Sequence, residues 1–252
     1  TKLMVKHSHR NSVAASYLAV SAYKLMRETG IKLDFIDTNP HLVRLYQQMG
    51  YRIYKENINP PDYGNVIPMV FLLDDVEYLK LIGSPFQRYA RNFTNTRESW
   101  EFFRQHFREY AYIKPLFSIK VDQLWEDFSN DLHKSPREVL TFLKDFSDDE
   151  CKQLLNQLDL IPYDPGDVVF QQGDESAGMF CILEGQAEAL VDSPQGPLPI
   201  AILNQGEIFG ELGFISQGER NATIKIRQTS RLLILTPNEF RKLERNSPHL
   251  AV

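Results

Sequence analysis

Glu211 and Arg220 are the two side chains whose types and spacing most directly suggest binding chemistry. They lie nine positions apart within Phe209–Thr223, and Gly210 and Gly213 flank the carboxylate. Glycines allow a backbone to approach a ligand closely, while an arginine and free backbone N–H groups suit a phosphate. A carboxylate accepts hydrogen bonds from two sugar hydroxyls. The segment predicts a pocket for a phosphorylated sugar; the alternative is a surface loop with an incidental ion pair.

Short apolar runs separated by turn residues surround this segment and predict a β-roll or barrel. The expected strands are Val168–Phe170, Met179–Leu183, Ala187–Val191, Pro199–Leu203, Ala222–Ile226 and Leu232–Leu235, with turns at 165–166, 173–174, 184–185 and 205–207. A helix is expected after Ser147, because an acid, Glu150, follows three residues later. Another is expected from Pro237 to Glu244, with Thr236 as its cap.

Three motifs in this region resemble the cyclic-nucleotide-binding domain family. Pro165–Asp174 and Met179–Ala187 look like the opening strands of that domain, and Phe209–Thr223 is similar to its phosphate-binding cassette. The resemblance covers about 110 residues, with the motifs in the family's order. It implies a β-roll (a double-stranded β-helix or jelly roll) over residues 146–252.

The resemblance also implies a role for each matching residue. Glu211 would accept the ribose 2′-hydroxyl, and Arg220 would pair with the exocyclic phosphate oxygens through charge-assisted hydrogen bonds. The ligand is expected to be cAMP or cGMP, with cAMP as the default because Asn221, not Thr, follows the arginine. The remaining expected ligand residues are Phe209, Gly210, Leu212, Ala222 and Thr223 in the cassette, and Val191 and Ile202 in an apolar wall around the base.

Residues 1–85 predict an α/β unit. The pattern is a helix over Val13–Glu28, a strand over Ile31–Asp37, a helix over His41–Met49, and strands over Tyr51–Tyr54 and Val66–Leu73. This order resembles the second half of a GNAT-type acyltransferase. Because the family's first half has no counterpart here and the sequence begins with Thr, we expect a preceding portion of the natural protein to be missing.

The acyltransferase resemblance rests on two segments. Arg10–Ala15 stands where the family binds the pyrophosphate of acyl-coenzyme A, which implies contacts from Arg10, Val13 and Ala15, although Val13 replaces a preferred Gly. Asn39–Tyr51 looks like the segment whose tyrosine protonates the departing thiolate, a role that would fall to Tyr46. The alternative for both is a purely structural role.

Residues 86–145 are rich in aromatic side chains and predict a helical connector. Ser99 is a candidate cap for a helix through Phe102 and Tyr110, and Val121–Leu132 shows a second helical stripe. Interleaved arginines also suggest binding of single-stranded nucleic acid. The helical spacing of the aromatic residues favours a core that docks the two flanking domains.

Composition narrows the class of protein. The 252 residues carry a net charge of −5, which gives no global preference for DNA or an anionic membrane. No apolar run is long enough to span a bilayer, so a cytoplasmic protein is expected. Cys151 and Cys181 are expected to be reduced thiols, with a disulfide left open. His7 and His9 lack a third ligand nearby, so no metal is expected.

These observations predict an α+β protein in three parts: residues 1–85, 86–145 and 146–252. The first hypothesis is a regulatory module in which a cyclic nucleotide modulates the attached acyltransferase-like domain. The alternative is an N-acyltransferase that uses coenzyme A or an acyl carrier, with a structural roll. Two further alternatives are a transcription regulator and a purely structural roll. The family's closing helix has no counterpart before Val252, so the connector, a second copy of the chain or another partner would supply the lid.

Overall fold

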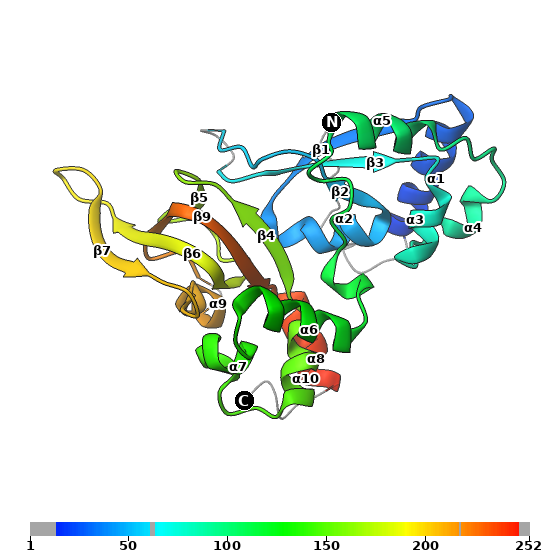
Figure 1. The fold of residues 1–252 in the computed structure, drawn as a ribbon. Helices are drawn as coiled ribbons and strands as arrows, with labels where there is room; N and C mark the ends of the chain where they lie inside the picture. The colour runs from blue at the N-terminus through cyan, green and yellow to red at the C-terminus, as the bar shows by residue number, and fades with distance from the viewer. Residues whose placement is uncertain (1–13, 61–63, 217, 247–252) are drawn as a thin grey trace. The chain divides into compact units, whose positions relative to one another are not determined.

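The computed structural model describes residues 14–60, 64–216 and 218–246 (Figure 1). The chain forms two compact units. The first comprises Thr1–Ile36, Leu45–Tyr54 and Met69–Ile113, and the second comprises Asp37–Arg44, Lys55–Pro68 and Lys114–Val252. Two short segments from the early part of the sequence therefore belong to the same unit as the C-terminal roll.

The first unit is built around a small sheet with strand order β1-β3-β2. Its elements, three of which extend into the second unit, are α1 Ala14–Glu28, β1 Leu33–Thr38, α2 Val43–Met49, β2 Tyr51–Ile53, β3 Ile67–Leu72, α3 Val76–Leu81, α4 Gln87–Ala90 and α5 Glu98–His106. The short helix η2 Pro40–Leu42 lies in the second unit. The strands and helices predicted for this part are confirmed to within a few residues.

Side chains cover both faces of β3, every residue of which is buried. Val70 and Leu72 pack with Phe103 of α5 on one face. Phe71, between them in sequence, stacks on Tyr23 of α1 with ring centroids 5.7 Å apart. Successive side chains of a strand point to opposite faces, so a central strand covered by helices on both faces is apolar throughout.

One predicted helix cap is wrong. α5 begins after Arg97, which has a left-handed φ of 57°, and this residue makes no side-chain capping bond. Ser99 lies inside the helix, and its hydroxyl donates to the buried carboxylate of Asp74. The serine satisfies a buried acid on another segment, a partner that local sequence cannot indicate.

The second unit contains an antiparallel roll with strand order β4-β9-β6-β7, to which β5 and β8 add by pairing with β9 and β6. Its elements are η3 Leu116–Ser118, α6 Val121–Leu132, α7 Pro136–Val139, η4 Thr141–Leu143, α8 Asp148–Leu155, β4 Asp159–Tyr163, β5 Val168–Phe170, β6 Met179–Val191, β7 Leu198–Leu203, β8 Ile208–Phe209, α9 Glu211–Ser216, β9 Thr223–Leu235 and α10 Pro237–Asn246. Helices α6, α7, α8 and α10 gather at one end of the roll (Figure 1).

Two pairs of predicted strands are in fact single long strands. β6 continues through the expected turn at Glu184-Gly185, and β9 runs without a break from Thr223 to Leu235. Gly185 has a φ of +96°, and the pairing of β6 with β9 changes register on either side of it. A glycine at a β-bulge bends a strand without ending it, which local sequence does not distinguish from a turn. β4 and β8 were not predicted.

Replacing Gly185 by alanine is expected to destabilise the roll by about 3 kcal/mol. An added Cβ would lie 2.2 Å from Ser230 Oγ and 2.5 Å from Thr229 O, and the residue has a positive φ. Gly196 has a φ of +110° but no atom within 4 Å of an added Cβ, so its alanine variant serves as the matched control and should lose only about 1 kcal/mol. Urea unfolding measures both changes; equal losses would show that the contacts around Gly185 are unimportant.

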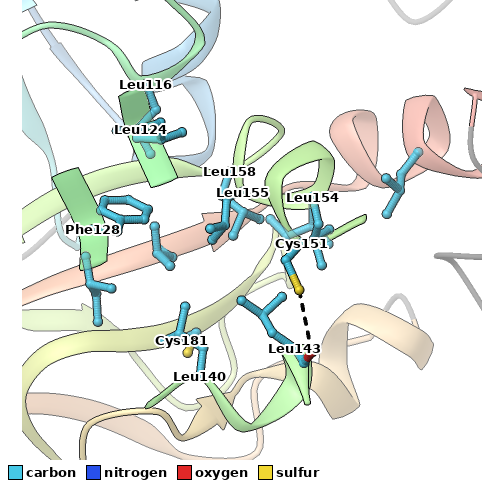
Figure 2. Close-up of a cluster of buried hydrophobic side chains, with 14 residues drawn as sticks. Leu116, Leu124, Phe128, Leu140, Leu143, Cys151, Leu154, Leu155, Leu158 and Cys181 are labelled. Atoms are coloured by element: carbon cyan, nitrogen blue, oxygen red, sulfur yellow. Dashed lines mark hydrogen bonds between the residues drawn. The ribbon is translucent and has the colours of Figure 1, made fainter. Parts of the chain in front are cut away.

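A buried apolar cluster joins the helices to the roll. Leu154 and Leu155 of α8 lie with Leu233 and Leu235 of β9 and with Leu243 of α10. Figure 2 shows Cys151 in this cluster, with its thiol pointing toward the Leu143 carbonyl. Both cysteines are free and buried, as predicted. Burial raises the pKa of Cys151 to about 11 and that of Cys181 to about 12, so both thiols stay protonated at neutral pH.

The predicted N-terminal caps of α8 and α10, the helices that precede and follow the strands of the roll in sequence, are confirmed. Ser147 and Glu150 form a reciprocal capping box at the start of α8. Thr236 Oγ1 accepts a hydrogen bond from the backbone N–H of Glu239 at the start of α10. These caps satisfy backbone donors that have no partner inside the helix.

Candidate functional site

The predicted cassette, Phe209–Thr223, links β8 to β9 through the short helix α9. Gly210 precedes α9 with a φ of +79°. A Cβ at this position would lie 2.6 Å from Arg220 Nη1, so a side chain would displace the guanidinium. The glycine therefore brings the two ends of the cassette together.

Arg220 is anchored inside the roll and is only 5% exposed. Nη1 donates to Gly210 O at 2.9 Å, and Nη2 donates to Gly178 O at 2.6 Å. The guanidinium also lies over the Phe170 ring, with Cζ 3.9 Å from the centroid. Its Nε has no hydrogen-bond partner among the described residues. Two of the five N–H groups thus fix the direction of the guanidinium, and the described residues leave the others available for further hydrogen bonds.

Burial lowers the pKa of Arg220 to about 10, while the charges of Asp174 and Glu211 act to raise it. The guanidinium remains protonated at neutral pH. Because it is positively charged and largely desolvated, an anion that reaches it gains more than it would at an exposed arginine.

The carboxylate of Glu211 is half-buried at the first residue of α9. It has no hydrogen-bond or ion-pair partner among the residues that the structure describes. It acts on Arg220 through its charge, without a direct ion pair. The structure therefore does not support the alternative of an incidental salt bridge, because both groups keep unused hydrogen-bonding capacity.

The other predicted cassette residues differ in exposure. Phe209 is 4% exposed and stacks on Phe180, with ring centroids 5.4 Å apart. Asn221 is exposed, and Ala222 and Thr223 are half-buried. Thr223 Oγ1 accepts a hydrogen bond from the backbone N–H of Gln172. Phe209 and Thr223 thus already have structural partners within the roll.

Exposed hydrophobic side chains occur on β7 and on α9. They are Leu198, Ile200, Ile202, Leu212 and Ile215. Val191, predicted for the same apolar wall as Ile202, pairs with Leu198 across β6 and β7.

The loop between β5 and β6 is hydrogen-bonded to the cassette. The backbone N–H of Arg220 donates to Asp174 O at 2.8 Å, and that of Ser176 donates to Gly218 O at 3.1 Å. The bond from Arg220 Nη2 to Gly178 O belongs to the same connection. Any displacement of Arg220 by a ligand therefore acts directly on this loop.

A cavity of about 340 Å³ lies beside this loop, entirely within the second unit. Its lining residues are Asn39, Pro40, His41, Gly64, Asn65, Val169, Phe170, Asp174, Glu175, Ser176, Ala177, Phe180, Arg220 and Ile234. Arg220 is the one predicted ligand residue among them. No motif indicated this cavity, because segments far apart in the sequence form it.

The acyltransferase residues predicted from the sequence are placed only in part. Arg10 and Val13 lie outside the described residues, and Ala15 is described only as part of α1. Tyr46 is half-buried in α2, with its ring edge-on to Tyr51 at 5.3 Å between centroids. The acyltransferase resemblance therefore stays a prediction.

Neither a candidate metal site nor a candidate membrane-spanning helix is found in the parts of the chain that the structure describes. Within these parts, no group of three or more His, Cys, Asp or Glu could hold a metal ion. None of the described helices is both long and apolar enough to cross a membrane. His7 and His9 lie outside the described residues.

The family match to known proteins lies within the roll. Residues 160–247 match the family model of the cyclic nucleotide-binding domain. The cAMP-dependent protein kinase regulatory subunit of Schizosaccharomyces pombe is 27% identical over 116 residues, which are 46% of this chain and 27% of that protein. The human cGMP-dependent protein kinase 2 is 31% identical over 88 residues, or 34% of this chain and 11% of that protein.

Among solved structures, a cyclic nucleotide-binding domain from Methylobacillus flagellatus is 24% identical, with a TM-score of 0.43, and the match covers 46% of this chain and 68% of that one. The chain spans about a quarter or less of the length of the two curated relatives named above. The family model confirms the predicted domain type for the roll, and it does not extend to residues 1–85.

Proposed function

We propose that the roll over residues 146–252 binds a cyclic nucleotide, with cAMP as the preferred ligand, and thereby regulates the unit attached to it. The observation that carries this proposal is the presence, within one cassette, of an anchored and charged arginine and of a glutamate that has no partner among the described residues. The match of residues 160–247 to the cyclic nucleotide-binding domain family supports it.

The geometry assigns a task to each end of the cassette. The guanidinium of Arg220, already held by two carbonyls, presents the remaining N–H groups of Nη1 and Nη2 to the cyclic phosphate without further ordering. Glu211 accepts the ribose 2′-hydroxyl, for which a free carboxylate is well suited. The exposed apolar side chains of β7 and α9 receive the base. The preference for cAMP rests on Asn221, which offers no threonine hydroxyl for guanine.

Regulation follows from the hydrogen bonds that tie the cassette to the β5–β6 loop. A ligand shifts a conformational equilibrium only through a difference in its affinity for the two states. A phosphate bound to the remaining N–H groups of Arg220 acts on the same guanidinium that holds Gly210 O and Gly178 O, so its affinity depends on the position of the loop. The lid is proposed to come from the connector or from a partner chain.

Isothermal titration calorimetry of the full chain with cAMP and cGMP tests this function. We expect saturable binding of one ligand per chain, with cAMP tighter than cGMP and at about micromolar affinity. Linear 5′-AMP is the control, because its dianionic phosphate is not closed onto the ribose. The absence of heat with either cyclic nucleotide, at concentrations well above about a millimolar, would overturn the proposal.

A further inference from the structure

The cavity beside the β5–β6 loop contains polar atoms that have no partner among the described residues. Arg220 Nε, Asn65 Oδ1 and Ser176 Oγ are all buried, and no described residue forms a hydrogen bond with them. Asn65 is 4% exposed and Arg220 is 5% exposed, so both side chains are more than nine-tenths buried. A buried polar group without a partner costs about 1–3 kcal/mol. Three such groups around one cavity indicate a ligand that would satisfy them.

Each of these three atoms requires a particular kind of hydrogen-bonding group on the ligand. Arg220 Nε is a charged donor, so it requires an acceptor, best supplied by an anion. Asn65 Oδ1 is an acceptor, because its amide nitrogen already donates to Asn59 Oδ1, and it therefore requires a donor. The hydroxyl of Ser176 can serve either group. The ligand must carry both an anionic acceptor and a donor.

Charge separates the interior of the cavity from its rim. The interior holds the guanidinium of Arg220, and the exposed carboxylates of Asp174 and Glu175 line the rim. Acids at the rim repel a polyanion and attract an ammonium group. Pro40, Val169, Phe170, Ala177, Phe180 and Ile234 form apolar walls.

His41 adds a proton-binding group beside the arginine. Burial and the charge of Arg220 both lower the pKa of His41, so the ring is neutral at neutral pH. A bound carboxylate between the two would offset the repulsion from Arg220 and provide an acceptor for a ring N–H.

We propose that this cavity is a second ligand site, which shares Arg220 with the cassette, and that it binds a small zwitterion with a carboxylate and an ammonium group, the chemistry of an α-amino acid. The carboxylate meets Arg220 Nε and His41, and the ammonium group meets Asn65 Oδ1 and the rim acids. Glu211, Leu212 and Ala222 do not line the cavity, so amino-acid binding does not require these three cassette residues. The volume of about 340 Å³ is large enough for a ligand of this size.

The test uses the full chain and four amino acids: glycine, L-alanine, L-serine and L-glutamine. Each is added at about 10 mM in a thermal unfolding assay, since a ligand that binds only the folded state raises Tm. Calorimetry then measures the affinity of any amino acid that does so. Sodium acetate and ethylamine hydrochloride, each at the same concentration, present the carboxylate and the amine separately.

Three variants locate the binding. Ala177→Leu fills the cavity from its wall and is expected to abolish amino-acid binding while cyclic-nucleotide affinity is kept. Ser176→Ala removes one hydroxyl without adding bulk, and it should weaken amino-acid binding about fivefold. Glu211→Gln weakens cyclic-nucleotide binding and should leave amino-acid binding unchanged. These variants therefore test amino-acid binding and cyclic-nucleotide binding separately, even if one of the two ligands does not bind.

The supporting result is that at least one amino acid binds at least about tenfold more tightly than acetate or ethylamine, and that Ala177→Leu and Ser176→Ala weaken this binding. Three results would overturn the proposal: no amino acid raises Tm, acetate binds as tightly as the amino acids, or neither cavity variant changes amino-acid affinity. Should Ala177→Leu fail to fold, Ser176→Ala decides the question alone.

Discussion

Replacing Arg220 by alanine is expected to weaken cyclic-nucleotide binding by at least about a hundredfold. The substitution removes a largely buried cation that donates to Gly210 O and Gly178 O and leaves N–H groups for the phosphate. Arg220→Lys keeps the charge but loses the planar fork that reaches two carbonyls and a ligand together, so it should recover only part of the affinity. Arg227, exposed on β9, supplies the matched control.

Calorimetry with cAMP measures this prediction, and urea unfolding of each variant separates loss of binding from loss of fold. Arg220→Ala also leaves two carbonyls without their donor, so a stability loss of about 2 kcal/mol is expected alongside the loss of affinity. Glu211→Gln weakens binding with little change in stability, because Glu211 has no partner among the described residues. Undiminished cAMP binding by Arg220→Ala would exclude the cassette as the phosphate site.

The second large effect is expected at Arg44, which is buried at 7% exposure in the same unit as the roll. Its Nη1 lies 3.2 Å from Asp159 Oδ1, and its Nε lies 3.9 Å from Glu239 Oε1. Nη2 donates to Asn156 O at 3.2 Å. Arg44→Met should destabilise the second unit by about 3 kcal/mol, because it leaves buried acids without their cation.

This cluster should also make stability depend on pH. Burial raises the pKa of Asp159 to about 7, against the lowering effect of Arg44, and the charge of Glu239 raises it further. Lys242, which donates to Glu239 Oε1, acts to lower it. Asp159 Oδ2 is buried and has no hydrogen-bond partner among the described residues.

The direction of this pH dependence follows from the number of protons that the folded and the unfolded chain each bind. Below about pH 4 the group is protonated in both the folded and the unfolded chain. Between that pH and about 7 the unfolded chain releases the proton first, so the stability contribution of Asp159 falls as the pH rises and levels off above its folded pKa of about 7. Without Arg44 the folded pKa is higher still, and the decline continues to a higher pH.

Thermal unfolding from about pH 5 to about pH 8 measures this dependence. Wild type should lose stability across the range, Arg44→Met should lose more, and Asp159→Asn should have a flatter profile. Asp145→Asn, at an exposed position, is the control and should follow wild type. A profile for Asp159→Asn parallel to that of wild type would show that Asp159 does not titrate in this window.

Local sequence was sufficient where the determining interactions lie within a few residues. The capping box of Ser147 and Glu150 and the helix over Val121–Leu132 are present as predicted. The strand predictions located the apolar runs correctly but divided β6 and β9. In β6 the division fell at Gly185, because a bulged glycine and a turn glycine have the same local signature. In β9 it fell at the polar residues 227–231, which continue the strand. The cap at Ser99 failed for a related reason, since its partner Asp74 lies 25 residues away.

By itself, the sequence determined that Glu211, flanked by Gly210 and Gly213, lies nine residues before Arg220, because spacing and residue type are local properties. Only the tertiary structure decided which carbonyls hold Arg220 and showed that Glu211 has no partner among the described residues. The same holds for the second cavity and for the buried cluster at Arg44. Each depends on contacts between segments more than 40 residues apart, such as Arg220 with Gly178 and Arg44 with Asp159. Chain packing sets these contacts, and no periodicity in the sequence encodes them.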